Sequence, residues 1–272
     1  MWLLVMFIFV PLTFFKCFGD YNAAENINVF LFGLQNFEFV DLTQSFGNNY
    51  WNCKRYETER YLNVCINDCH GTEIDANYNN TDMFDKEKTV GNISLKNLVV
   101  PLIIADISDK VNGNENFVLY KEHLDYFLNN YFGDITQPCL MVFKFGWSEY
   151  FIDRRKYCGI QDDNKTRNYP GVSEEVAQWI TSSYKNIVGV GVDLPTLDPG
   201  GYIDTLPATR TLINAGVYVL KNVKLDMYLP EASCTALVAP PKVGDVGSLP
   251  LRLIAICPKS RMQKPQILLH HL

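Results

Sequence analysis

Six short runs rich in Val, Ile, Leu and Phe recur along the chain, and they constrain its fold more than any other feature. Most of these runs are too short for helices, and their composition is typical of β-strands. Stretches with a helical pattern lie between them. This mixture predicts an α/β domain with a mixed sheet. The predicted strands are residues 29–34, 98–104, 139–145, 187–192, 217–220 and 251–256.

The clearest predicted helix follows Pro170 and Gly171. Ser173 stands in the N-cap position, and Glu174 and Glu175 in the first turn suit the helix dipole. Two further stretches, 120–130 and 208–215, also have helical patterns.

No internal repeat, Pro-rich linker or long charge block divides the chain. We therefore predict a single domain over residues 20–258, followed by a flexible polar tail over residues 259–272.

Residues 1–19 are predicted to be a signal peptide. The apolar run at 2–15 is too short to span a bilayer, and the small residues Cys17 and Gly19 suit a cleavage site. No Lys or Arg precedes the run, so an uncleaved anchor or a buried strand remains an alternative. The prediction is a secreted, extracellular protein with no membrane partner.

Two other features, the sequons and the cysteines described below, agree with export. The chain has three Asn-x-Ser/Thr sequons, which predict a glycoprotein. The net charge of −6, with no basic block, argues against a nucleic-acid partner. The sequons begin at Asn79, Asn92 and Asn164.

The chain has eight cysteines, of which Cys17 lies in the predicted signal peptide. Because the remaining number is odd, we expect some disulfide pairing and at least one free thiol. Proximity in sequence suggests Cys53 with Cys65 or Cys69, and Cys139 with Cys158.

One segment carries a family resemblance. Residues 69–79 read Cys-His-Gly-Thr-Glu-Ile-Asp-Ala-Asn-Tyr-Asn. This stretch resembles the His-x-Gly-Thr-His-x-Asp-x-Pro-x-His motif of the cyclase/kynurenine formamidase family. Further segments resemble the same family in the same order, so the resemblance covers about residues 41–256. These are Asp-Leu-Thr at 41–43, Phe-Gly-Trp at 145–147, the stretches 169–179 and 191–199, Leu-Pro at 206–207, and 247–252.

The resemblance implies a swivelling β/β/α fold, a cyclase-like single domain that is usually a homodimer. It also implies one or two divalent ions, zinc or manganese. Such an ion lowers the pKa of bound water, and the resulting hydroxide opens an amide bond, as in N-formylkynurenine.

Most of the residues that the family uses are replaced here. Cys69 and Glu73 stand at the first two histidine positions of the motif, and Asp75 is the only retained metal-ligand position. Downstream, the resemblance assigns a histidine ligand position to Thr209 and a glutamate ligand position to Lys221. Asn79 occupies the position of the proton-transfer histidine, and a glycan on its sequon would open the rim of the site.

The histidine content agrees with this interpretation. The chain has four, His70, His123, His270 and His271, and a three-histidine site cannot be assembled from them in one compact core. We therefore expect no metal cofactor and no intact catalytic set.

Lys221 is the most informative replacement. A protonated amine only donates hydrogen bonds and cannot ligate a metal. The change to Glu73 adds a negative charge beside Asp75, and buried carboxylates are costly without a partner. We hypothesise that Lys221 pairs with Asp75 and Glu73 in place of the ion.

These residues predict a non-catalytic protein, a pseudoenzyme that binds a small aromatic ligand or a protein partner. One alternative is a metal-dependent hydrolase with a rearranged site, for which Cys69, His70, Glu73 and Asp75 could supply ligands. Another is an inactive subunit that associates with an active relative.

Other polar and aromatic residues have simpler interpretations. Cys69 and His70 could form a nucleophile pair, although a disulfide or core cysteine is the simpler reading. Asp193 and Asp198 are interpreted as loop-capping residues. Trp147 and Trp179 are interpreted as core residues.

Overall fold

In the computed structural model of this chain, the structure describes residues 33–45, 71–77, 88–130 and 135–262. One compact unit spans Glu38–Leu272, and Met1–Phe37 forms a separate unit. Among the described residues, no helix is both long and apolar enough to span a bilayer.

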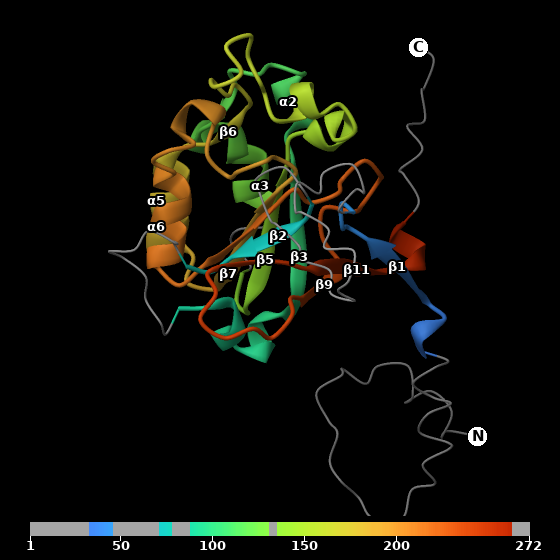
Figure 1. The fold of residues 1–272 in the computed structure, drawn as a ribbon. Helices are drawn as coiled ribbons and strands as arrows, with labels where there is room; N and C mark the ends of the chain where they lie inside the picture. Colours follow the sequence, from blue (N-terminus) through green and yellow to red (C-terminus); the bar gives the residue numbers. More distant parts are fainter. Residues whose placement is uncertain (1–32, 46–70, 78–87, 131–134, 263–272) are drawn as a thin grey trace, which may run out of the picture. The chain divides into compact units, whose positions relative to one another are not determined.

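A nine-stranded mixed sheet forms the centre of the compact unit (Figure 1). Its strand order is β1-β11-β9-β3-β5-β7-β8-β2-β10. The four strands β3, β5, β7 and β8 run parallel, whereas β9 and β2 are antiparallel to β3 and β8 at the two sides of this group. The strands are β1 (Phe37–Asp41), β2 (Glu73–Asp75), β3 (Val99–Asp106), β5 (Cys139–Lys144), β7 (Ile187–Val192), β8 (Tyr218–Lys221), β9 (Cys234–Ala239), β10 (Ser248–Pro250) and β11 (Arg252–Pro258), with β4 (Val118–Leu119) and β6 (Gly171–Val172) in a small second sheet.

Helices cover one face of the sheet, and α5 lies beside α6 there (Figure 1). The α-helices are α2 (Ser108–Val111), α3 (Asp125–Asn130), α4 (Arg154–Tyr157), α5 (Glu174–Ser183) and α6 (Pro207–Asn214). Short 3-10 turns are η2 (Val90–Asn92), η3 (Leu95–Asn97), η4 (Lys121–Leu124), η6 (Trp147–Tyr150), η7 (Gly200–Tyr202) and η8 (Lys259–Arg261).

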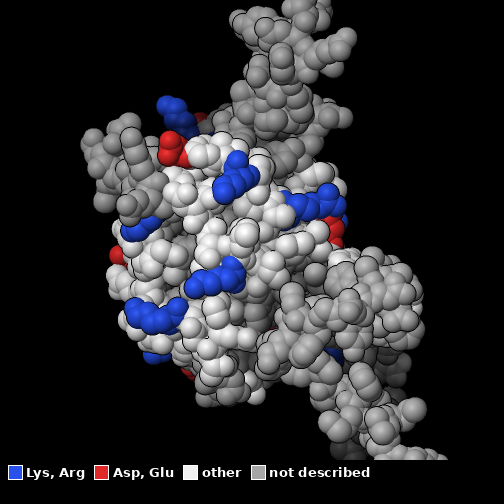
Figure 2. All heavy atoms as spheres, turned by 90° about the horizontal axis from the view of Figure 1, so that it is seen from below, with Lys and Arg blue, Asp and Glu red and all other residues white. Residues whose placement is uncertain are grey.

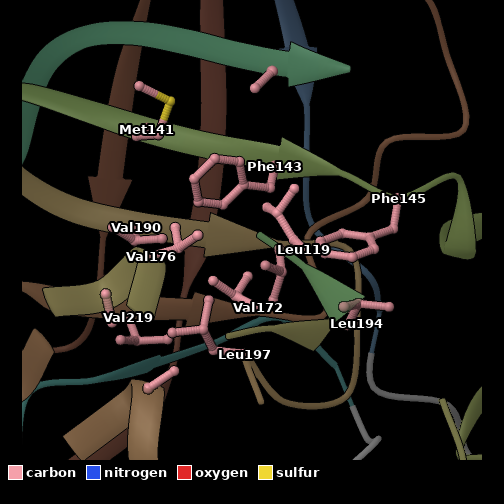
Figure 3. Packing of buried hydrophobic residues seen from close by; sticks show 14 of the residues in the cluster. Leu119, Met141, Phe143, Phe145, Val172, Val176, Val190, Leu194, Leu197 and Val219 are labelled. Atoms are coloured by element: carbon pink, nitrogen blue, oxygen red, sulfur yellow. The ribbon is translucent and has the colours of Figure 1, made fainter. Parts of the chain in front are cut away.

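Side chains alternate along the buried strands and so form two apolar clusters. In β5, Met141 and Phe143 point to the helical face, where they pack with residues of β7, β8 and α5 (Figure 3). Leu140 and Val142 point to the opposite face and join the second cluster. Both clusters are buried, so the parallel strands are apolar on both faces.

The sheet curls around the second cluster. The Leu42 backbone N–H donates to the Leu253 carbonyl at 2.9 Å, and the Leu42 carbonyl accepts from Lys224 N at 2.9 Å. Leu42 directly follows β1 and Lys224 follows β8, so strands far apart in the sheet order meet. This closure positions the end of β8 and the adjacent strand β2.

The predicted α/β class with a mixed sheet is confirmed. The predicted strands at 98–104, 139–145, 187–192, 217–220 and 251–256 correspond to β3, β5, β7, β8 and β11. The predicted helices correspond to η4 with α3, to α5 and to α6. Ser173 caps α5 as expected, since its Oγ accepts from Val176 N at 3.3 Å.

The predicted strand at 29–34 is wrong where the structure describes it. Gly33 and Leu34 are helical, and residues 29–32 lie outside the described part. The strand forms instead at Phe37–Asp41, where pairing with β11 buries Val40. Pairing with a distant strand, and not local apolar content, decides where β1 begins.

The two ends of the sequence are described only in small part. The predicted signal peptide, residues 1–19, lies outside the described residues. In the predicted tail, Lys259–Arg261 forms a 3-10 turn, and residues 263–272 lie outside the described part.

Candidate functional site

Strands β2 and β8 bring three of the predicted site residues together. Glu73 stands directly opposite Lys221 in the antiparallel pair, and Asp75 is two residues further along β2. Their neighbours Ile74 and Leu220 belong to the second apolar cluster. Because side chains alternate, Glu73, Asp75 and Lys221 all project to the helical face of the sheet.

The Lys221 ammonium lies between the two carboxylates. Its Nζ is 3.2 Å from Glu73 Oε2 and 3.2 Å from Asp75 Oδ2. The three side chains are shielded, with 10% of Lys221, 1% of Glu73 and 16% of Asp75 exposed. The hypothesis that Lys221 pairs with Asp75 and Glu73 is therefore confirmed. We call these three residues the ion cluster.

The ion cluster does not fit a divalent metal ion. Two carboxylates could serve as ligands, but their facing oxygens are both taken by a donor-only ammonium. A divalent cation close to Nζ would also be repelled by its charge. Asp75 Oδ1 and Ser248 Oγ, on neighbouring strands, are buried without a hydrogen bond to the described residues.

The Gly-Thr part of the motif has a structural role. Thr72 Oγ1 donates to the Asn222 carbonyl at 2.7 Å and accepts from Gln44 N at 2.7 Å. Asn222 Nδ2 donates to the Gly71 carbonyl at 2.7 Å, while Tyr157 Oη donates to Asn222 Oδ1 at 2.9 Å. These buried bonds fix the chain just before Glu73 against the chain just after Lys221. These hydrogen bonds keep β2 in register with β8 and do not involve the side chains of Glu73, Asp75 or Lys221.

Comparison with protein families agrees with this geometry. A family model described as "Putative cyclase" matches residues 40–199, more than half of the chain. The chain belongs to the Cyclase family. No curated protein matches the sequence.

Solved structures of similar fold include proteins whose titles name hydrolases. Isatin hydrolase A from Ralstonia solanacearum has a TM-score of 0.70 and 22% identity, covering 89% of this chain and 100% of its own. Isatin hydrolase A from Labrenzia aggregata has a TM-score of 0.70 and 21% identity, covering 87% and 100%. A protein titled as a potential metal-dependent hydrolase with cyclase activity has a TM-score of 0.57 and 20% identity, covering 84% and 100%. At these identities the likeness shows the shared Cyclase fold.

Thr209 is held by a carboxylate outside the ion cluster. Its Oγ1 donates to Asp198 Oδ2 at 2.6 Å. Asp198 also accepts from the backbone N–H groups of Thr209 at 3.0 Å and Ala208 at 2.6 Å. Asp198 therefore caps the N-terminus of α6, and the interpretation of Asp198 as a capping residue is confirmed. Burial raises its pKa, which these hydrogen bonds oppose.

Asp193 caps the chain after β5 in the same way. Its carboxylate accepts from the backbone N–H groups of Phe145 at 2.7 Å, Trp147 at 2.8 Å and Ser148 at 3.2 Å. Burial raises the pKa of Asp193 to about 6, against the effect of these donors. Trp147 is fully buried, so its interpretation as a core residue is also confirmed. Trp179 packs on the same core, with the Lys121 ammonium 5.2 Å from its ring centroid.

The cysteine predictions need one correction. Cys139 is a buried free thiol, so the predicted Cys139–Cys158 pair is wrong. Cys139 begins β5 and Cys158 directly follows α4, and closeness in sequence does not bring their sulfur atoms together. Burial raises the pKa of Cys139 to about 11.

A disulfide forms elsewhere, between Cys234 and Cys257. These residues stand opposite each other on β9 and β11, one step beyond the Thr235–Ile256 pair. Predicting this disulfide from the sequence would have required knowing that β9 pairs with β11, and in which register.

Several predicted positions lie outside the described residues: Cys53, Cys65, Cys69, His70 and Asn79. The other two sequon residues, Asn92 and Asn164, are exposed. Within the described part, no three His, Cys, Asp or Glu side chains form a group that could hold a metal ion.

Proposed function

We propose that this Cyclase-family chain is a non-catalytic binding protein in which Lys221 replaces the metal ion of a hydrolytic site. One observation carries the proposal: the Lys221 Nζ lies 3.2 Å from both Glu73 and Asp75. Metal-dependent amide hydrolysis requires an ion that lowers the pKa of bound water. An ammonium between the carboxylates supplies positive charge but no open coordination position.

The ligand that we propose is a small aromatic molecule, with a protein partner as the other possibility for the same fold. The titles of two similar structures support an aromatic ligand, since one isatin hydrolase is bound to thioisatinate and another to benzyl benzoate. We also propose a homodimer, by analogy with the family resemblance.

Export is part of the proposal. The Cys234–Cys257 disulfide suits an oxidising compartment, and Asn92 and Asn164 are exposed, as glycosylation requires. These observations support a secreted glycoprotein, together with the apolar run near the N-terminus.

The decisive experiment measures metal content and hydrolysis with the purified full chain. Zinc or manganese is added, excess is removed, and bound metal is quantified by mass spectrometry. Hydrolysis of N-formylkynurenine and of isatin is followed in parallel. We expect less than stoichiometric metal and no turnover above buffer.

Two variants of one residue provide a matched comparison. Lys221→Glu places a third carboxylate beside Glu73 and Asp75, so this variant should gain manganese or zinc binding. Lys221→Gln removes the ammonium without adding a carboxylate and should gain much less. Stoichiometric metal in the unmodified protein, with turnover abolished by Asp75→Ala, would instead establish a metal-dependent hydrolase with a rearranged site.

A further inference from the structure

A cavity of about 610 Å³ opens at the ends of β3 and β5, and we call it the β3–β5 cavity. Asp106, the last residue of β3, and Lys144, the last residue of β5, both line it. In α/β proteins, ligands bind beyond the carboxyl ends of parallel strands. None of the ion-cluster residues is in its lining, so this cavity is a second candidate site.

The back wall of the cavity is held rigidly. Asp193 fixes the backbone from Phe145 to Ser148 through its three hydrogen bonds. Ser148 Oγ then donates to the Val223 carbonyl at 3.0 Å and accepts from Leu225 N at 2.9 Å. The chain after β5 and the chain after β8 are thereby tied to each other where they line the cavity. A wall that is already ordered loses little conformational freedom when a ligand binds.

Negative charge dominates the lining. Its carboxylates are Asp106, Asp109, Glu149 and Asp226, and its only described cation is Lys144. The Lys144 ammonium is paired with Asp106 at 2.7 Å, which leaves three carboxylates in excess. Asp226 has only a loose contact with Lys224, at 3.9 Å.

Apolar and aromatic groups lie among these carboxylates. Phe145 and Leu225 are buried, and Tyr150, Met227 and Tyr228 are partly exposed in the lining. The Glu149 carboxylate is hydrogen-bonded to Tyr150 and raises the pKa of that phenol. The Lys156 ammonium, which pairs with Glu115 at 2.6 Å, already lies 5.2 Å from the Tyr150 ring centroid, so among the described lining residues Tyr228 offers the aromatic face for a ligand. An aromatic face and carboxylates together attract an organic ammonium group, because the ring quadrupole and the negative charge act in the same direction.

We propose that the β3–β5 cavity binds a small organic cation, a protonated amine attached to an apolar or aromatic body. The three excess carboxylates come from α2, η6 and the chain after β8, so they surround the ligand from separate segments. The volume suits a molecule of drug-like size. The apolar groups, which make up the smaller part of the lining, contact the body of the ligand, while Asp109, Glu149 and Asp226 attract its charge. An anionic ligand of the same shape is repelled.

The test compares three probes of nearly equal shape on the purified full chain. These are 2-phenylethylamine, 2-phenylethanol and phenylacetate, followed by isothermal titration calorimetry and ligand-observed NMR. We expect the amine to bind, the alcohol to bind at least about tenfold more weakly, and phenylacetate not to bind. Added salt should weaken binding of the amine.

Isosteric variants locate the site. Glu149→Gln and Asp226→Asn each remove one charge, and together they should weaken amine binding by about tenfold or more. Asp162→Asn is the matched control, since Asp162 pairs with Arg155 at the surface and does not line the cavity. Thermal unfolding confirms that the variants fold.

The proposal is overturned if the alcohol binds as well as the amine, if no amine binding is found, or if the double variant binds like the control. These results do not depend on the metal measurements. Metal binding at the ion cluster would overturn the proposed function and leave this cavity untouched.

Discussion

Lys221 sits between Glu73 and Asp75 with nine-tenths of its side chain hidden from solvent. The pairing of Lys221 with these two carboxylates could be predicted from the sequence. The family resemblance places all three residues at ligand positions, and a buried carboxylate requires a counter-charge. The Cys234–Cys257 disulfide could not, since it depends on the pairing of β9 with β11. The family resemblance places Thr209 at a ligand position, and only the structure shows that its hydroxyl is hydrogen-bonded to Asp198.

Removing the ammonium should strongly destabilise the protein. Lys221→Met leaves two buried carboxylates without their cation, so the free energy of unfolding should fall by about 3–5 kcal/mol. Denaturation by urea at neutral pH measures the change.

A partly exposed lysine three residues away is the control. Lys224 lies 3.9 Å from Asp226, so Lys224→Met should cost less than about 1 kcal/mol. Equal effects for the two variants would mean that the ion cluster contributes no more than a surface pair.

At the scale of elements, local patterns predicted α5 and most central strands because these are long, apolar and well bounded. β2 and β10 are three residues each and carry little periodic signal. β9 was missed for a different reason: its sequence Cys-Thr-Ala-Leu-Val-Ala includes several small residues, and it becomes a strand through pairing with both β3 and β11. The sequence indicates Asp198 as a capping residue but not that it caps α6, since Asp198 is separated from Ala208 by ten positions.

The two long helices should respond differently to loss of their caps. Asp198→Ala removes three buried hydrogen bonds at the N-terminus of α6 and should lower the free energy of unfolding by about 2–4 kcal/mol. Ser173→Ala removes a single cap bond of α5 and should cost about 1 kcal/mol. Urea denaturation of both variants measures this ranking, and the reverse order would contradict the role assigned to Asp198.

For the whole molecule, the α/β class followed from the sequence, whereas the closure of the sheet did not. The closure depends on bonds between Leu42, Leu253 and Lys224, which lie far apart in the chain. Charge is also distributed unevenly. The acidic β3–β5 cavity lies at one end of the parallel strands, and the face seen from below in Figure 2 has Lys and Arg side chains spread over it.

Reduction of the disulfide should weaken the whole fold. Cys234 and Cys257 are 23 positions apart, and opening a loop of this size should lower the free energy of unfolding by roughly 3 kcal/mol. Thermal unfolding with and without reductant measures the change.

The double variant Cys234→Ser/Cys257→Ser should match the reduced protein and show no further response to reductant. A large response that persists in this variant would assign the effect to cysteines other than this pair.

The positive charge between Glu73 and Asp75 is part of the polypeptide, and this has a consequence for how the protein matures. The charge arrives with synthesis of the chain, not by uptake of a trace element. A chelator has nothing to withdraw from it, and metal starvation cannot leave these carboxylates uncompensated. On the proposed function, we therefore expect the amount of correctly assembled protein to be independent of the zinc or manganese supply of the cell that makes it.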